Sequence, residues 1–307
     1  MMIPITIESR TGDTLFSYME RQITRLQRHG QYRTAETYTT TLNSFRRFRE
    51  ETDLPLAELT GELLSDYEYH LRCTGVTPNT VVFYLKRLRA VYNRAVDEEL
   101  VTNRNPFRKV STSSVKTAKR AIPLKYIKRL KELDLSHSRC RCFARDMFLF
   151  SFYTRGMSFI DMAHLKRSNL KGNILSYRRQ KTGQSLAMHW EPCMKKIALK
   201  YASSASSPYL LPIIRHPEDD VRKQCHAALT KINRHLKELG CTIGLPSPLT
   251  MYVARHSWAS IARDEGIPLS VISEGMGHES EKTTRIYLAS LESQVIDNAN
   301  KKILAKL

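Results

Sequence analysis

The sequence predicts a mainly α-helical protein of two domains, with a small antiparallel β-sheet in the second domain. Its 307 residues are about twice the length of a typical single domain. Apolar residues recur at helical spacing through most of the chain, whereas the alternation typical of strands is confined to residues 174–189. A basic segment of small polar residues, 108–120, separates the two helical regions. We therefore expect domains over residues 10–107 and 121–307, joined by a linker.

Four helices are predicted in the first domain. Apolar side chains at helical spacing are Leu15, Met19, Ile23 and Leu26; Tyr38, Leu42 and Phe45; Leu63, Tyr67 and Leu71; and Val81, Leu85, Leu88, Tyr92 and Ala95. The fourth helix has a clear start, because Thr77 can cap it and Pro78 suits its first turn. Asn105-Pro106 ends it. The polar faces carry Arg33, Arg46, Arg47, Lys86, Arg87 and Arg89. These cations indicate either an ordinary solvated face or a DNA-binding face.

The linker 108–120 (R-K-V-S-T-S-S-V-K-T-A-K-R) contains lysines and arginines but no acidic residue. Its small polar residues favour a flexible connection. A basic linker can also follow a DNA backbone, which would let two domains close around a duplex.

The second domain restarts at Pro123 with helical patterns and one strand pair. Helices are expected over 123–133, 139–153, 158–165, 190–201, 218–239, 251–265 and 268–275. The expected strands are 174–177 and 185–189. The segment R-R-Q-K-T-G-Q joins them, with Lys181-Thr182-Gly183 in or beside the turn.

The charge of the chain is strongly basic. Lysine and arginine number 49 against 30 acidic residues, a formal net charge of +19. The chain through Arg120 has 19 basic and 14 acidic residues, and the remainder has 30 and 16, so the second part carries most of the excess. A polyanion such as nucleic acid is the first partner to consider, because neutralising phosphates releases counterions. A soluble protein that is basic without binding nucleic acid is the alternative.

Other features narrow the class of protein. The N-terminus shows no secretory signal pattern, and no apolar run reaches membrane-spanning length, so a cytoplasmic location is expected. The six cysteines are scattered, without paired C-x-x-C motifs, so reduced thiols are favoured over a zinc site. Hydrophobic residues make up 41% of the chain, which excludes global disorder.

Three short stretches of the second domain carry the functional pattern. They are F-Y-T-R-G-M-S-F-I-D-M-A-H-L (152–165), L-T-M-Y-V-A-R-H-S-W-A-S (249–260) and M-G-H-E-S-E-K-T-T-R-I-Y (276–287). An R-H-S, then G-H, then a tyrosine nine residues beyond that histidine is a rare combination. The chain therefore resembles the tyrosine recombinase (phage integrase) family. The R-G-M-S-F-I-D segment resembles the branch formed by integrases and invertases of bacterial mobile or invertible elements.

The resemblance implies a fold and an activity. The fold would be an N-terminal four-helix SAM-like core-binding domain followed by an α+β tyrosine-recombinase catalytic domain. The activity would be site-specific cleavage and rejoining of duplex DNA for integration, excision or inversion, in dimers or tetramers on DNA and at the nucleoid. Residues 289–307 would form a C-terminal helix that docks on a neighbouring protomer or packs against its own protomer. Accessory DNA-bending proteins can assist such enzymes.

The resemblance also assigns residues. Tyr287 would be the nucleophile, forming a 3′-phosphotyrosyl bond that stores the bond energy, so neither ATP, metal nor other cofactor is expected. Arg255 matches the family's second arginine, whose fork of donors suits the charge on phosphate oxygens. His278 matches the histidine that donates to the phosphate, and Lys181 the general acid for the leaving 5′ oxygen. His256, directly after Arg255, is expected either to contact and position the catalytic groups or to act as an acid–base partner.

Two positions depart from the family pattern. Tyr252 stands where the family usually has histidine; its phenol can donate a hydrogen bond but is a poor base. Ser158 stands where the first arginine usually lies. Arg155, three residues earlier and one helical turn away if that segment is helical, is expected to supply the missing charge.

Alternatives remain open for each residue and for the function. Tyr287 could be a core residue, His278 a helix cap, and Lys181 a solvated turn lysine. A type IB topoisomerase shares the chemistry but needs no target sequence. A catalytically inactive DNA-binding regulator derived from a recombinase would also explain Tyr252 and Ser158.

Overall fold

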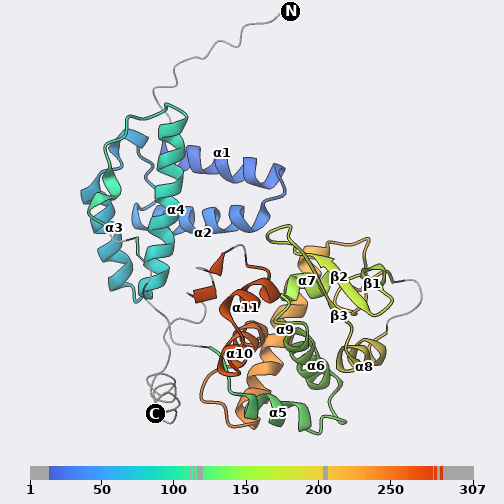
Figure 1. The fold of residues 1–307 in the computed structure, drawn as a ribbon. Helices are drawn as coiled ribbons and strands as arrows, with labels where there is room; N and C mark the ends of the chain where they lie inside the picture. Colours follow the sequence, from blue (N-terminus) through green and yellow to red (C-terminus); the bar gives the residue numbers. More distant parts are fainter. Residues whose placement is uncertain are drawn as a thin grey trace, which may run out of the picture. The chain divides into compact units, whose positions relative to one another are not determined.

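The chain divides into two units, Met1–Ala118 and Lys119–Leu307 (Figure 1). The computed structural model describes residues 14–110, 112–113, 115, 120–202, 207–278, 280–281 and 284–285. Parts of the expected linker, the nucleophile Tyr287 and the expected C-terminal helix 289–307 lie outside these described residues. The expected boundaries 10–107 and 121–307 therefore stay predictions.

The first unit contains the four predicted helices and two short 3₁₀ turns. They are α1 (Leu15–Arg28), α2 (Tyr32–Phe48), η1 (Leu56–Glu58), α3 (Gly61–Cys73), α4 (Pro78–Asp97) and η2 (Pro106–Arg108). Aromatic side chains knit the helices together: the rings of Phe45 and Tyr67 meet edge to face at 4.9 Å, and the Tyr67 hydroxyl donates to Ser44 Oγ at 2.7 Å. The buried phenol is thus satisfied, so α2 and α3 pack without an unpaired polar group.

Three details of the first unit differ from the sequence expectation. Helix α4 ends at Asp97, well before the expected end at Asn105-Pro106. Leu64, rather than Leu63, is fully buried on α3. The side chain of Thr77 makes no capping bond to the backbone of α4; its hydroxyl meets that of Thr80 at 2.9 Å. Thr60 instead caps α3, accepting from the Leu63 N–H at 3.2 Å.

The second unit is mainly helical with one small sheet. Its helices are α5 (Leu124–Glu132), α6 (Arg139–Tyr153), α7 (Phe159–Ala163), η3 (Arg167–Asn169), α8 (Pro192–Lys200), α9 (Val221–Thr242), α10 (Met251–Asp264) and α11 (Leu269–Met276). Helix α6 packs against α5, α8, α9 and α10, and its Phe148 and Phe150 are completely buried. None of the helices in the described part of the chain is long and apolar enough to cross a lipid bilayer.

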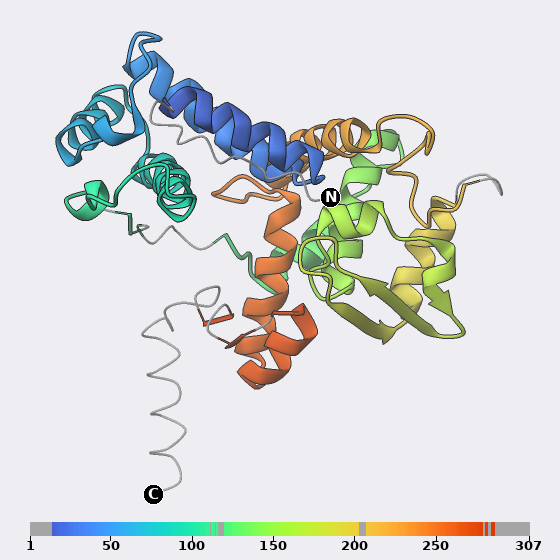
Figure 2. The same ribbon diagram turned by 90° about the horizontal axis from the view of Figure 1, so that it is seen from above.

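The sheet has three antiparallel strands in the order β1-β2-β3, namely β1 (Leu170–Lys171), β2 (Ile174–Arg178) and β3 (Ser185–His189). The sequence predicted β2 and β3 but not the two-residue β1. Leu175 pairs with Met188, and both are buried under one face of the sheet. The strands lie at one side of this unit (Figures 1 and 2). The β2–β3 turn, residues 179–184, extends from their end.

Candidate active site

One cavity in the second unit gathers residues from all of the motif-bearing stretches that the structure describes. Its volume is about 840 Å³. The start of α7, the β2–β3 turn, α9, the start of α10 and the end of α11 contribute to its walls. The lining residues are Arg120, Met157, Ser158, Phe159, Arg179, Lys181, Thr182, Leu229, Asn233, Thr250, Met251, Tyr252, Arg255, Gly277 and His278. The motif residues therefore converge, although more than a hundred positions separate Ser158 from His278 in the chain.

Arg255 is a buried arginine held by backbone carbonyls. Only 8% of the residue is exposed. Its Nη1 donates to the carbonyl oxygen of Gly156 at 2.9 Å, and its Nη2 donates to that of Met276 at 2.7 Å. A buried guanidinium needs such acceptors, because an unmatched charge away from water is costly. The group is fixed in place before any phosphate arrives.

Gly156 is a position where a side chain cannot fit. Its φ is +75°, and a Cβ there would lie 2.6 Å from the Cα of Arg255. The turn after α6 can approach α10 this closely only because glycine has no Cβ. The same approach brings the Gly156 carbonyl within reach of the guanidinium.

His278 lies next to Arg255, directly after Gly277, which ends α11 with φ +65°. Its Nε2 is 3.0 Å from Nη2 of Arg255, and its Nδ1 is 2.7 Å from Oγ1 of Thr284. Because arginine only donates, Nε2 is the acceptor here and Nδ1 carries the proton. Burial, followed by the charges of Arg255 and Arg179, lowers the pKa of His278 from 6.5 to about 4. To donate a hydrogen bond to a phosphate through Nε2, His278 must carry its proton on Nε2 instead, which is the other tautomer.

Tyr252 and His256 lie one turn apart on α10, and their rings meet edge to face. The ring centroids are 4.5 Å apart and nearly perpendicular. Tyr252 lines the cavity and is half exposed, so its phenol is accessible to a ligand. His256 does not line this cavity; burial, then the charges of Arg120 and Arg255, lowers its pKa to about 4. Its position behind Tyr252 suits the expected supporting role, which stays a prediction.

The β2–β3 turn places two cations at the cavity. Lys181 is exposed and lines the cavity, where sequence analysis expected the general acid. Arg179, which sequence analysis did not single out, lines it too. Its Nη1 donates to the Gly277 carbonyl oxygen at 2.5 Å, and its side chain is only 10% exposed. The signal for Arg179 was strand alternation: Leu175 and Tyr177 face inward, and two residues further on Arg179 faces the same way.

Ser158 is a helix cap at the edge of the cavity. Its Oγ accepts from the Asp161 N–H at 3.3 Å and donates to Asp161 Oδ2 at 2.6 Å. The other oxygen of Asp161 accepts from the Gln180 N–H at 2.8 Å, which ties the β2–β3 turn to α7. Asp161 is 4% exposed, and sequence analysis assigned it no role.

Arg155 takes a different position. Its φ is +59°, in the left-handed region, so the segment before Ser158 is a turn rather than helix. Its Cδ is 3.7 Å from where a Cβ of Gly275 would lie, close to α11. Arg155 is not among the residues lining the cavity described above. Its expected role is untested.

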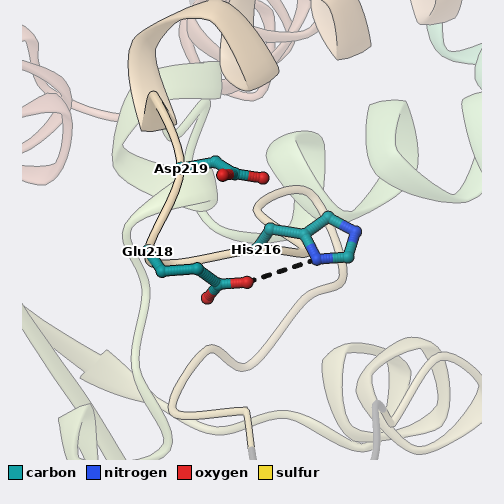
Figure 3. A group of neighbouring side chains, drawn as sticks. All are labelled: His216, Glu218 and Asp219. Atoms are coloured by element: carbon teal, nitrogen blue, oxygen red, sulfur yellow. Dashed lines mark ion pairs between the residues drawn. The ribbon is translucent and has the colours of Figure 1, made fainter.

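A group of possible metal ligands lies elsewhere in the second unit. His216, Glu218 and Asp219 precede α9, and their ligand atoms lie within 4.8 Å of one another. All three are exposed, and His216 Nδ1 approaches Glu218 Oε1 at 3.4 Å (Figure 3). None of them lines the cavity that contains Arg255. Exposed acidic groups commonly lie together in this way without binding a metal.

Family models match both units of the chain. The model described as phage integrase SAM-like domain matches residues 14–113, and the one described as phage integrase family matches residues 147–294. Together they span most of the sequence. The chain belongs to the phage integrase family of tyrosine recombinases. The family and the fold class predicted from the sequence are both confirmed.

Individual relatives of this family member are distant. Tyrosine recombinase XerC of Syntrophus aciditrophicus (strain SB) is 23% identical over 285 residues, which cover 86% of this chain and 89% of that protein. Tyrosine recombinase XerC of Rickettsia canadensis (strain McKiel) is 34% identical over 102 residues, or 32% of this chain. XerD of Agrobacterium fabrum is 29% identical over 110 residues, 36% of this chain. The alignments with the last two cover 31% of each relative's length.

Solved structures of integrases share the fold of this tyrosine recombinase. A lambda integrase dimer bound to a COC′ core site has a TM-score of 0.69 at 17% identity, over 95% of this chain and 83% of that one. The Tn1549 transposon integrase in complex with transposon right end DNA has a TM-score of 0.66 at 11% identity, over 95% and 100%. At these identities the likeness supports the fold.

Proposed function

We propose that this chain is an active site-specific DNA recombinase, which cleaves and rejoins duplex DNA through a 3′-phosphotyrosyl bond to Tyr287. One observation carries the proposal: Lys181, Arg255 and His278, each assigned from the sequence, line a single cavity. Tyr287 follows His278 by nine residues, the spacing that suggested the family. A group of cations around an open cavity suits a phosphodiester.

The reaction can be assigned to these residues. The Tyr287 oxygen forms a bond to phosphorus and gives up its proton to solvent water, while the bond from phosphorus to the 5′ oxygen breaks. The electron pair stays on that 5′ oxygen, and Lys181 protonates it. Arg255 balances the charge on the non-bridging oxygens, with Tyr252 as a hydrogen-bond donor. His278 becomes a second donor in the tautomer that carries the proton on Nε2. Attack by another 5′ hydroxyl reverses these steps and joins new strands.

The proposed partners are duplex DNA and further copies of the chain. The net charge of +19 favours a polyanion. The lambda integrase structures contain a dimer on a core site and a tetramer on a Holliday junction, and we extend both assemblies to this chain. The N-terminal unit and the basic linker would add DNA contacts, in the cytoplasm at the nucleoid. Accessory DNA-bending proteins would assist.

Covalent capture from random DNA tests the function and finds the target sequence in the same experiment. The full chain is incubated with nicked duplexes of random sequence, and DNA that resists removal by detergent is sequenced. The expected result is a short, enriched sequence attached to protein, absent for the matched variant Tyr287→Phe, which should still bind DNA. Adducts without sequence preference, together with relaxation of any plasmid, would indicate a type IB topoisomerase. Sequence-specific binding without adducts would indicate an inactive regulator.

A further inference from the structure

The cavity contains a second guanidinium that the family motif does not provide. Ser158 occupies the position of the usual first arginine, so the motif supplies only Arg255. We propose that Arg179, on the β2–β3 turn, is a catalytic residue that binds the scissile phosphate in place of that absent arginine. The inference rests on the recombinase function proposed above and names a residue for the same reaction.

Arg179 is fixed beside the other candidate catalytic groups. Its Nη1 donates to the carbonyl oxygen of Gly277, the residue directly before His278. Its backbone N–H donates to the Gln184 carbonyl oxygen, and its own carbonyl oxygen accepts from the Gly183 N–H. These two bonds fix the backbone of Arg179 against the other end of the turn. Since the side chain is 10% exposed, the guanidinium is positioned before DNA binds.

Arg179 also faces the partner of Ser158. Its Nε lies 4.0 Å from Asp161 Oδ2, the same oxygen that accepts from the Ser158 hydroxyl at 2.6 Å. The Asp161 carboxylate thereby contacts both Arg179 and Ser158, the residue at the position of the usual first arginine. A charge placed here lies next to the usual site of the first arginine, although it comes from a different element.

The charge of Arg179 is incompletely matched by the protein. The carboxylate is at the outer limit of an ion pair, and Nη2 has no hydrogen-bond partner among the described residues. The charge reaches His278, whose pKa it lowers together with Arg255. A phosphate oxygen between these groups would supply the missing acceptor and counter-charge.

The other arginines near the site are less suited. Arg155 does not line this cavity. Arg120 lines it but is exposed. Arg178, the neighbour of Arg179, is exposed and donates through Nε to the Gly183 carbonyl oxygen at 2.6 Å. It has the same charge and is the last residue of β2, directly before the turn, so Arg178→Ala is a matched control.

The test uses the full chain and a nicked duplex of the sequence that it captures. Arg179→Ala should bind this duplex as wild type does, yet form the covalent adduct about 10²–10³ times more slowly. Arg178→Ala should stay near the wild-type rate. Arg179→Lys keeps the charge without the fork and should recover part of the rate.

A duplex with a methylphosphonate at the scissile position separates catalysis from structure. A methyl group replaces one non-bridging oxygen and removes the phosphate charge, so less charge needs to be balanced. Arg179→Ala should therefore regain most of the lost rate, relative to wild type on the same duplex. A structural defect would persist on both substrates.

Two outcomes would overturn the role of Arg179. In the first, Arg179→Ala forms the adduct as fast as Arg178→Ala. In the second, Arg179→Ala and Arg179→Lys lose the same rate, relative to wild type, on the methylphosphonate duplex as on the ordinary one. If methylphosphonate instead rescues Arg155→Ala, the first arginine is Arg155. Failure of the recombinase function looks different, because then the wild-type chain itself captures no duplex, and the catalytic role of Arg179 falls with it.

Discussion

Arg255 and Lys181, two cations that line the cavity, are held in different ways. On the α10–α11 wall, Arg255 is buried and bonded to two carbonyls and to His278. On the β2–β3 turn, Lys181 is exposed. A group that balances charge works best when fixed and dry, whereas a proton donor must regain its proton from solvent. We therefore expect Arg255, like the buried Arg179, to serve charge stabilisation and the exposed Lys181 to serve proton transfer.

The largest effect should come from the buried wall. Arg255→Ala should slow adduct formation by about 10²–10³ at saturating protein. It should also destabilise the second unit, because the Gly156 and Met276 carbonyls lose their donor. Single-turnover cleavage and thermal melting measure the two losses. Arg263→Ala, near the end of the same helix, should leave the rate unchanged; equal rates for the two variants would contradict the comparison.

Lys181→Ala should affect proton transfer alone. We expect adduct formation to slow by about 10², with no change in melting temperature because the side chain is exposed. Sulfur in place of the scissile 5′ bridging oxygen should restore the rate, since a thiolate leaves without a proton. The same duplex should not rescue Arg255→Ala. Rescue of both variants, or of neither, would mean that charge stabilisation and proton transfer are not divided between Arg255 and Lys181.

Gly156→Ala tests how tightly the buried wall is packed. A Cβ would lie 2.6 Å from Arg255 Cα at a φ of +75°, so the free energy of unfolding should fall by about 2–4 kcal/mol. Gly172→Ala is the control: its φ is +57°, but nothing lies within 4 Å of the added Cβ. Backbone strain alone should cost it about 1 kcal/mol. Equal losses in urea denaturation would show that the close approach adds nothing.

The smallest effect concerns pH. The pKa values of His278 and His256 fall to about 4 in the folded chain, against 6.5 for an ordinary histidine. Between these values the unfolded chain binds more protons, so their contribution to stability is complete above pH 6.5 and is lost as pH falls toward 4. For each variant, the melting temperature is measured at pH 7.5 and at pH 4.5. The difference between the two temperatures should be smaller in His256→Gln than in the surface variant His226→Gln. An unchanged pH dependence would mean that burial of His256 is unimportant.

Helices and motifs could be predicted from local sequence, because each depends on spacing along one segment. The four N-terminal helices and the strands β2 and β3 lie where periodicity placed them. The two-residue β1 carries too little pattern, and its pairing with Leu175 depends on a tertiary partner. The burial of Leu64 instead of Leu63 depends on how α3 is rotated against its neighbours.

The candidate site was predictable only where the family motif reaches. Lys181, Arg255 and His278 converge on one cavity. Arg179 and Asp161 were missed because their importance comes from partners on other elements, Gly277 for the first and Gln180 for the second. The sequence left open whether the segment between Arg155 and Ser158 is helical, and the structure has a left-handed turn there.

The hydrogen bond between His278 and Thr284 has a thermodynamic consequence. Thr284 is fully buried and precedes Tyr287 by three residues. One bond of 2.7 Å thus connects the histidine of the cavity to the segment that carries the tyrosine. Coupling of this kind is reciprocal: a ligand that favours the bonded state of His278 favours the bonded state of Thr284 by the same free energy. Occupancy of the cavity and formation of the hydrogen bond between His278 and Thr284 are therefore one linked equilibrium.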